Sequence, residues 1–366
     1  MKFSVETAKL KGLVASVIKA VPNTTVVPVY KGIMFTVKDG VLRVTCMNES
    51  TALRNASPVT GDDCEFMLDA GRVDAIVKAV SGDVVEFEDA GQFITITCGK
   101  SEFRLLKFGG GSTLPSFLNV DSDEIAVDGK VFKELIAYTN FATAKDDDGR
   151  PAVFTGIYVS LGDKVLKAAG TNSHHIASYR KDIGVDGNFT IVIPADVMND
   201  LAKLLTDDVV KLKLRGSRML LSQNEFECAL TGISGNFPPY ERIIPASSRV
   251  TVKIDRKELL TALTRVSLCA SDVASCVKFT VNSDNLTLNA KSQEGFGEEP
   301  VDAEVTKDTD EPFVIAFNSK YMVNALKTMK EDKVTLGFNQ VLSPATVKME
   351  GKDEFLYIIS AIRTVN

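Results

Sequence analysis

The residues best suited to chemistry lie at 171–175, where two histidines follow a threonine and a serine. His174 and His175 are the only histidines among the 366 residues. A hydroxyl of Thr171 or Ser173 beside an imidazole would be the usual arrangement of an activated nucleophile. However, adjacent side chains on an extended segment point to opposite sides, and no acidic residue is in register to orient either ring. We therefore predict that the chain is not an enzyme.

Other ligand-forming residues do not favour a cofactor or a metal. The six cysteines are spread from position 46 to position 276 without a CxxC pair. This spacing is typical of small buried side chains in a reducing compartment. The glycine-rich segment at 109–112 lacks the Lys and Ser or Thr of a phosphate-binding loop. We expect no cofactor and no metal.

The composition is that of a folded protein, with 45% hydrophobic and 25% charged residues. No apolar run approaches the roughly 18–20 residues that cross a bilayer. Residues 1–12 lack the apolar core of a signal peptide. Together with the cysteine pattern, these features predict a cytoplasmic location.

Six amphipathic helices are predicted from apolar residues at helical spacing. They are expected at 6–20, 72–80, 130–145, 194–205, 256–270 and 319–330. These segments hold 15 Lys or Arg residues against six Asp or Glu residues, although the whole chain has a net charge of −6. At about 100° per residue, each helix places a basic residue opposite its apolar stripe. These residues are Lys19, Lys78, Lys130, Lys203, Arg265 and Lys320.

A base opposite an apolar stripe is usually just a solvated face. Six such helices in an acidic protein instead indicate a segregated basic surface that faces a polyanion. No base-reading motif is present, so the expected contacts are with phosphates, without sequence preference. Arg72, on the second helix, is included among the residues expected to face the polyanion.

The chain repeats itself three times, at intervals of about 120–125 residues. A Glu-Phe pair recurs at 102–103, 225–226 and 354–355. Each repeat runs helix, strands, helix, strands, with hairpin signals between the alternating strands. We predict an α+β fold in which helices cover one face of antiparallel sheets. Joins rich in Gly, Pro and Ser at 108–121 and 236–248 divide the chain into domains 1–120, 121–246 and 247–366.

Over its whole length the sequence resembles the bacterial sliding clamp, the beta subunit of DNA polymerase III. The most specific stretches are GTNSHHIASYR at 170–180, GNFPPYERIIP at 235–245 and EFLYIISAIR at 354–363. The resemblance implies three clamp domains per chain, with sheets outside and two helices per domain facing a pore. It further implies a head-to-tail dimer that closes into a ring around duplex DNA.

The function that the resemblance implies is that of a processivity factor. The ring would slide on DNA and tether the replicative polymerase, the clamp loader and repair proteins through short peptides. The alternative is a peptide-binding scaffold without a DNA role, which would keep the peptide pocket but has no use for six basic helix faces. No membrane partner is expected.

The resemblance also implies a hydrophobic pocket for the partner peptides, with Arg242 as a polar gate. His175 stands where the family usually has arginine, and Ser173 where it often has glycine. Residues 360–362 replace a bulkier Met-Pro-Met. The expected pocket residues are Phe154, Thr171, Ser173, His174, His175, Ile176, Pro238, Arg242, Ile243, Pro344, Thr346, Ile358, Ile359, Ser360, Ala361 and Ile362.

The dimer interface is expected, again by resemblance, between the first domain of one chain and the third domain of the other. Phe103 and Leu105 on an edge strand would meet Leu268 and Cys269 at a helix end. Cys269 replaces a larger aliphatic residue, which favours a somewhat looser ring.

Overall fold

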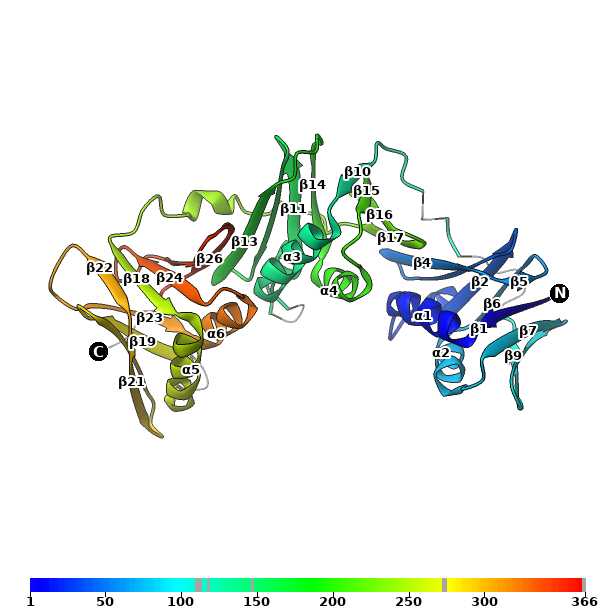
Figure 1. The fold of residues 1–366 in the computed structure, drawn as a ribbon, viewed down its shortest axis with the longest axis horizontal. Helices are drawn as coiled ribbons and strands as arrows, with labels where there is room; N and C mark the ends of the chain where they lie inside the picture. The colour runs from blue at the N-terminus through cyan, green and yellow to red at the C-terminus, as the bar shows by residue number, and fades with distance from the viewer. Residues whose placement is uncertain (109–113, 117–118, 146–147, 272–274, 364–366) are drawn as a thin grey trace. The chain divides into compact units, whose positions relative to one another are not determined.

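The structure is a computed structural model that describes residues 1–108, 114–116, 119–145, 148–271 and 275–363. The six predicted helices are present, with different ends (Figure 1). The strands pair in antiparallel fashion, so helices on antiparallel sheets confirm the predicted α+β class. The helices are α1 Thr7–Val17, α2 Ala70–Ala79, α3 Gly129–Thr139, α4 Ala195–Leu204, α5 Arg256–Val266 and α6 Ser319–Thr328.

The predicted helices at 6–20, 130–145 and 256–270 are too long. The helix α1 ends at Val17 and is followed by the 3₁₀ turn η1 Ile18–Ala20. In the structure α3 and α5 are each followed by one 3₁₀ turn, η3 Asn140–Ala142 and η6 Ser267–Cys269. At these ends a hydroxyl donates to the carbonyl oxygen four residues earlier, Thr139 to Leu135 at 2.7 Å and Ser267 to Leu263 at 2.5 Å. Such a bond competes with the helical pattern of the backbone. The helical sequence pattern continues beyond the point where the backbone changes.

The helix starts have a simple local cause. Asp69, Asp255 and Asn318 precede α2, α5 and α6, and each side chain accepts a hydrogen bond from a backbone N–H of the first turn. A short acidic or amide side chain at this position satisfies N–H groups that have no partner within the helix. In α2 the backbone N–H of Arg72 donates to Asp69 Oδ1 at 2.8 Å.

The chain forms two compact units, described here separately. Unit 1 comprises Met1–Lys130 and Lys203–Gly232, and unit 2 comprises Val131–Ala202 and Ile233–Asn366. The predicted domain boundaries after residues 120 and 246 stay predictions. The first predicted join includes residues 109–113 and 117–118, which lie outside the described residues, whereas Leu114 packs against Met47, Ala52 and Ala229.

Unit 1 contains a five-stranded and an eight-stranded sheet. Four phenylalanines, Phe3, Phe35, Phe66 and Phe87, pack together in its core, and the ring centroids of neighbouring pairs are 4.8–6.3 Å apart. The five-stranded order is β5 Thr60–Gly61, β1 Lys2–Glu6, β7 Val84–Ala90, β8 Phe93–Cys98 and β9 Ser101–Leu106. The eight-stranded order is β10 Ile125–Val127, β15 Val210–Arg215, β16 Arg218–Gln223, β17 Phe226–Thr231, β4 Thr51–Pro58, β3 Val41–Met47, β2 Gly32–Lys38 and β6 Cys64–Asp69.

Unit 2 contains a nine-stranded and a four-stranded sheet, and α5 and α6 pack together in it (Figure 1). The nine-stranded order is β14 Phe189–Pro194, β11 Gly156–Gly162, β12 Val165–Thr171, β13 His175–Asp182, β26 Lys352–Ile359, β25 Ala345–Met349, β24 Lys333–Phe338, β18 Val250–Asp255 and β22 Glu304–Lys307. The four-stranded order is β21 Phe296–Asp302, β20 Asn285–Lys291, β19 Cys276–Val281 and β23 Phe313–Asn318.

Each large sheet is two half-sheets from consecutive repeats joined at a seam. In unit 1 the seam is β17·β4, where Glu227 lies opposite Arg54. In unit 2 it is β13·β26, where Ser178 lies opposite Leu356. The two smaller sheets are half-sheets of the same kind whose edge strands, β9 and β21, have one neighbour each among the described strands.

Candidate functional site

The segment that carries the two histidines is a tight turn between β12 and β13. Asn172 Oδ1 accepts hydrogen bonds from the backbone N–H groups of His174 and His175, at 3.0 and 3.3 Å. The Thr171 hydroxyl donates to the carbonyl oxygen of His175 at 2.7 Å. Ser173 has a φ of 74°, in the left-handed region. The hydroxyl of Thr171 thus holds the turn together, and it does not contact an imidazole.

His175 is buried and points into the unit. Its Nδ1 lies 3.1 Å from the Tyr357 hydroxyl, and its ring stacks on Tyr321 with 4.3 Å between centroids. Burial, with a smaller contribution from His174, lowers the pKa of His175 to about 3. Its imidazole is therefore neutral at physiological pH.

His174 is exposed and makes a different contact. Its Nε2 lies 2.8 Å from Nη2 of Arg150. A guanidinium has no acceptor, so Nε2 of His174 accepts this hydrogen bond and any ring proton is on Nδ1. Within the described residues the hydrogen-bond partners of the two rings are Tyr357 and Arg150, so a catalytic triad is not formed here.

An apolar surface lies next to this turn, on the β12–β13–β26 part of the sheet. Ala169, Ile176, Tyr240 and Ile358 are buried together there, and four partly buried residues pack against them. These four are Tyr158, Phe237, Ile244 and Leu356. The rings of Tyr158 and Phe237 are stacked at 5.1 Å. The second predicted join is thus also a wall of the candidate site, with the 3₁₀ turn η5 Tyr240–Ile243 in it.

The structure brings several of the predicted pocket residues together. His175 lies opposite Ile359, Ile176 lies opposite Ile358, and the Ser360 N–H donates to the His174 carbonyl oxygen at 2.9 Å. Thr171, His175, Ile176, Thr346, Ile358 and Ile359 are buried. Phe154, Pro238, Pro344, Ala361 and Ile362 are half-buried, and Ser173, His174, Arg242, Ile243 and Ser360 are exposed.

Sequence reasoning missed several residues that shape this site, among them Arg150, Tyr158, Tyr321 and Phe237. Arg150 and Tyr321 contact the two histidines, while Tyr158 and Phe237 cover the apolar surface. Phe237 lies in the stretch 235–245 that carries the family resemblance, so its aromatic side chain could have been predicted to line the site. Tyr321 lies on α6, far away in sequence, and no local pattern connects it with position 175.

The comparisons with known proteins agree with this architecture. Models of the N-terminal, central and C-terminal domains of the DNA polymerase III beta subunit match residues 1–110, 126–239 and 241–363. The chain belongs to this family. It is a sliding clamp with three clamp domains, and it is a non-catalytic subunit that acts in DNA replication.

Individual relatives are similar over nearly the full length of the clamp. The beta sliding clamp of Staphylococcus aureus is 28% identical over 364 residues, covering 95% of each chain, and that of Bacillus subtilis is 27% identical over 383 residues, covering 100% of each. A sliding clamp structure from Bacillus subtilis has a TM-score of 0.92 at 24% identity. A beta subunit structure from Pseudomonas aeruginosa has a TM-score of 0.93 at 21% identity. Both structures are covered completely and share the fold of this clamp.

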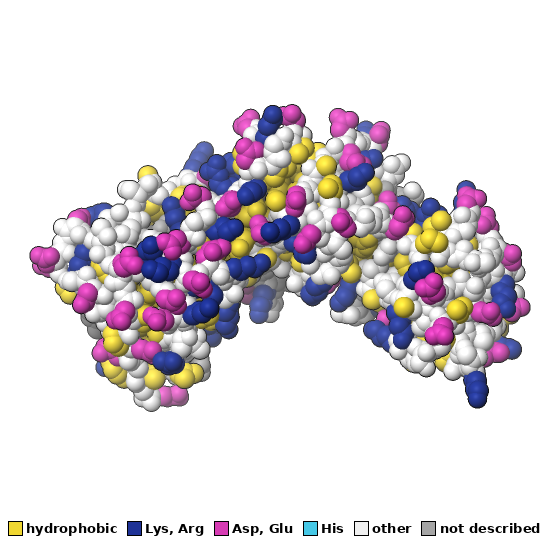
Figure 2. Space-filling view, viewed as in Figure 1, with side chains coloured by type: hydrophobic (Ala, Val, Ile, Leu, Met, Phe, Trp, Pro, Cys, Tyr) yellow, Lys and Arg dark blue, Asp and Glu magenta, His cyan; other side chains and the backbone are white. Residues whose placement is uncertain are grey.

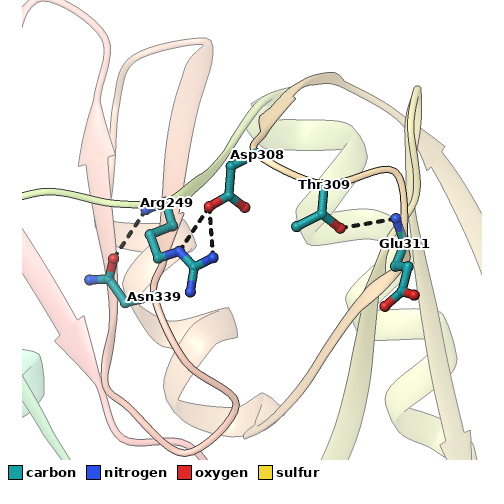
Figure 3. A network of polar contacts seen from close by, with 5 residues as sticks. All are labelled: Arg249, Asp308, Thr309, Glu311 and Asn339. Carbon is teal, nitrogen blue, oxygen red and sulfur yellow. Dashed lines mark hydrogen bonds and ion pairs between the residues drawn. The ribbon is translucent and has the colours of Figure 1, made fainter.

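A polar network in unit 2 of the clamp fixes the end of the second join (Figure 3). Nε and Nη2 of Arg249 donate to Asp308 Oδ2 at 2.9 and 2.7 Å, and the Arg249 N–H donates to Asn339 Oδ1 at 3.0 Å. Asn339 in turn donates to the carbonyl oxygen of Ser247 at 2.8 Å. Asn339 begins the loop that leads to Pro344, so this network positions one of the predicted pocket residues.

The seven predicted DNA-facing residues of the clamp are exposed. They lie on α2, α3, α4, α5, α6 and the 3₁₀ turn Ile18–Ala20 that follows α1. Lys78 forms an ion pair with Asp74 at 2.6 Å, and Arg265 forms one with Glu299 at 2.8 Å. On the face in view, Figure 2 shows acidic side chains spread over the sheets with basic side chains among them. The DNA contacts themselves stay predictions.

The predicted interface residues of the clamp differ in exposure. Leu105 is buried and Phe103 is half-buried, both on the edge strand β9 of the five-stranded sheet. Leu268 in η6 is 84% exposed and Cys269 beside it is half-buried. An 84% exposed leucine is available for a contact that a single chain does not make.

Metal binding has no support in the described part of the clamp. In those residues, groups of three or more His, Cys, Asp and Glu side chains that could hold an ion are not found. Among the described helices, none is long and apolar enough to span a membrane.

Proposed function

We propose that two copies of this clamp join head to tail into a closed ring that encircles duplex DNA. The observation that carries this proposal is that two edge strands, β9 and β21, are the repeat equivalents of the strands that pair at the seams. The other two boundaries between half-sheets are seams, β17·β4 and β13·β26, and both are antiparallel. A third seam of the same kind, β9·β21, needs a second chain. Two such seams per ring close the assembly after two subunits.

The register of the third seam follows from the other two. Glu227 and Leu356 each follow the repeated Glu-Phe pair, and they lie opposite Arg54 and Ser178. The corresponding residue of β9 is Arg104. In each hairpin, the first paired residue of the second strand marks the equivalent position: Ala52 in β4, Ile176 in β13 and Phe296 in β21. Arg54 and Ser178 lie two residues after this position, and the residue two after Phe296 is Glu298. Arg104 of one chain is therefore expected opposite Glu298 of the other.

Charge and shape support this register. Arg54 and Glu227 form an ion pair across the seam in unit 1, and the pair of Arg104 and Glu298 would repeat it with the charges exchanged. Leu106 is 61% exposed and Phe296 is 59% exposed, and the register places them opposite each other. A cavity of about 370 Å³, lined in part by Ala262, Arg265 and Glu299, lies beside β21. The same register directs Phe103 of the other chain toward Glu299 and this cavity.

The function of the ring would be to hold partners on DNA. Basic side chains on the inner helices would contact phosphates without sequence preference, which allows sliding. The apolar surface beside the His174–His175 turn would bind short peptides of the polymerase, the clamp loader and repair proteins. Its buried floor and exposed Arg242 and Ile243 suit an extended apolar peptide. The expected cytoplasmic location belongs to this proposal, because the duplex DNA is there.

The test is a covalent ring. Directly opposed strand residues have Cβ atoms about 4.5–5.5 Å apart, which is close to disulfide geometry. We expect Arg104→Cys with Glu298→Cys to give an oxidised dimer that stays on circular plasmid DNA in high salt and leaves it once the plasmid is linearised. Pairing Lys100→Cys with Glu298→Cys is the out-of-register control. Equal retention on circular and linear DNA would falsify the encircling ring.

A further inference from the structure

One hairpin loop of unit 2 is longer than its equivalents in the other repeats. In the first two repeats the hairpins after α2 and α4, which are β7·β8 and β15·β16, are closed by two residues each, 91–92 and 216–217. The corresponding hairpin after α6, β24·β25, is closed by the six residues 339–344. The internal repeat therefore shows that this loop is longer than the fold requires.

The 339–344 loop exposes two neighbouring aliphatic side chains. Val341 is 56% exposed and Leu342 is 54% exposed. Asn339, at the start of the loop, is fixed by the polar network described above (Figure 3). Near its end, the Ser343 N–H donates to the carbonyl oxygen of Gln340 at 3.0 Å. Apolar side chains that gather on the surface, here on a loop held in place, are typical of a contact with another protein.

The loop also forms one wall of a hollow of about 330 Å³. The apolar part of the lining comes from Val250, Pro312, Phe313 and Val341. The polar residues drawn in Figure 3 line the same hollow. A concave surface with apolar walls and a polar rim suits the side chain of a bound peptide.

The charges of this hollow favour an uncharged occupant. Its described lining includes two cations and two carboxylates. Arg249 forms an ion pair with Asp308, and Lys307 Nζ donates to the carbonyl oxygens of Asp310 and Glu311 at 3.3 and 3.0 Å. Both cations are thus engaged within the molecule. The occupant that suits the hollow is an aliphatic or aromatic side chain.

The loop lies at the same end of the nine-stranded sheet as the His174–His175 turn. His175 lies opposite Ile359, and Ile359 lies opposite Ala345, the residue after the loop. Neighbouring strands are about 4.8 Å apart, so β25 is about 10 Å from β13, and β18, which carries Val250, is about 19 Å from it. An extended chain rises about 3.3 Å per residue. About six residues of a peptide therefore span the distance from the turn to the hollow.

We propose that the 339–344 loop and its hollow extend the peptide site. The flank of a partner peptide seated beside the His174–His175 turn would cross the ends of β26, β25 and β24 and place an aliphatic or aromatic side chain against Val341 and Phe313. This inference rests on the peptide binding proposed above. It adds a contact outside the expected pocket, because Val341 and Leu342 are not among the pocket residues that the resemblance implies.

The first measurement is the affinity of the full-length clamp for the purified replicative polymerase of the same organism, by surface plasmon resonance. We expect Val341→Asp combined with Leu342→Asp to weaken binding at least fivefold. Thermal unfolding should stay unchanged, because both side chains are exposed. Leu342→Met keeps an apolar side chain and should bind within about twofold of the wild type. Val209→Asp in unit 1 is the matched control, since Val209 is 53% exposed.

Photocrosslinking identifies the occupant. Benzoylphenylalanine replaces Ile243, beside the candidate site, or Val341, on the loop, and each variant is irradiated in complex with the polymerase. We expect both positions to crosslink to one segment of the polymerase, at residues within about ten positions of each other. A crosslink from position 341 to a segment remote from the one reached from position 243 would mean that the loop contacts a separate surface, and the proposal would be wrong.

Two further variants separate the alternatives. If Ile243→Asp abolishes polymerase binding while the double loop variant binds like the wild type, the peptide site stands and its extension is wrong. If neither variant weakens binding, both the peptide site and the extension are wrong. A chain that ends at Arg363 tests whether the clamp's own C-terminus is the occupant. Stronger binding by this shorter chain, together with no effect of the double loop variant, would also overturn the inference.

Discussion

Arg54 and Glu227, which are 173 residues apart in sequence, form an ion pair across the seam in unit 1. Nε of Arg54 donates to Oε2 of Glu227 at 2.5 Å, and about a third or less of each side chain is exposed. The two strands on which they lie come from different repeats and form one sheet. The contact therefore links two repeats, whereas a contact within a hairpin links two strands of the same repeat.

The first prediction concerns this pair. We expect Arg54→Ala to lower the free energy of unfolding by about 1 kcal/mol, because a partly buried carboxylate loses its partner. Urea unfolding of the two single variants and of the double variant with Glu227→Ala measures the coupling. Lys9→Ala is the control, since its ion pair with Glu6 is exposed and is expected to contribute little. If the effects of the two single variants on the free energy of unfolding simply add up to that of the double variant, the prediction is wrong.

The second prediction concerns pH. The pKa of His175 is lowered to about 3 in the folded protein, against 6.5 when the chain is unfolded. Below pH 6.5 the unfolded state therefore binds a proton that the folded state does not, and stability falls as the pH falls from 6.5 toward 3. Between pH 7 and pH 5 this one group should remove about 2 kcal/mol.

Replacement of the ring isolates this contribution. His175→Phe should show a stability loss between pH 7 and pH 5 that is smaller than that of the wild type by about 2 kcal/mol. His174→Asn is the matched control, because it leaves the buried imidazole in place. Denaturant unfolding at the two pH values is the measurement. Equal pH dependence in His175→Phe and the wild type would show that this imidazole is not held neutral by the fold.

Much of the fold was predictable because the signals are local and repeated. Apolar spacing indicated all six helices, and the Glu-Phe pairs marked equivalent strands in the three repeats. The partners of the strands were not predictable in this way. Alternation on β17 shows which side chains share a face, but it does not indicate that β4 lies beside it.

The candidate site was predicted in part for the same reason. The resemblance placed His174 and His175 at the site, but the chemistry of position 175 depends on Tyr321 and Tyr357, more than 140 residues away in sequence. An adjacent pair of histidines gives no local sign that one is buried and the other exposed. That difference arises from the turn at Ser173 and from the pairing of β13 with β26.

The third prediction concerns the turn itself. Ser173 has a φ of 74°, a conformation that costs a residue with a Cβ atom about 1 kcal/mol relative to glycine. We expect Ser173→Gly to raise the free energy of unfolding by about 0.5–1 kcal/mol, since the bond from its N–H to Thr171 is retained. Ser283→Gly, in a turn without a positive φ, should give no gain. Destabilisation by Ser173→Gly would mean that the serine side chain has a role of its own.

The fourth prediction tests the helix cations. Lys78, Lys203 and Arg265 changed together to Glu should abolish most polymerase stimulation, because three expected phosphate contacts are replaced by repulsion. The slope of log Kobs against log salt should also become shallower by about 0.9 for each lost contact. The control changes the same number of basic residues at hairpin tips, Lys38, Lys164 and Arg215, all exposed. Equal stimulation by the two triple variants would favour a peptide-binding scaffold without a DNA role.

The fifth prediction concerns the open edge strand β9. Leu106 is 61% exposed in the single chain, so Leu106→Asp should leave the thermal unfolding of the monomer nearly unchanged. In the proposed ring the same side chain lies opposite Phe296 of the other chain, where burial of a leucine is worth about 1.5–3 kcal/mol per interface. The dimer should therefore weaken by a factor of at least ten, as measured by sedimentation equilibrium. Val26→Asp is the control, because Val26 is 93% exposed and lies in a loop outside the strands. If both variants sediment like the wild type, β9 is not the subunit interface.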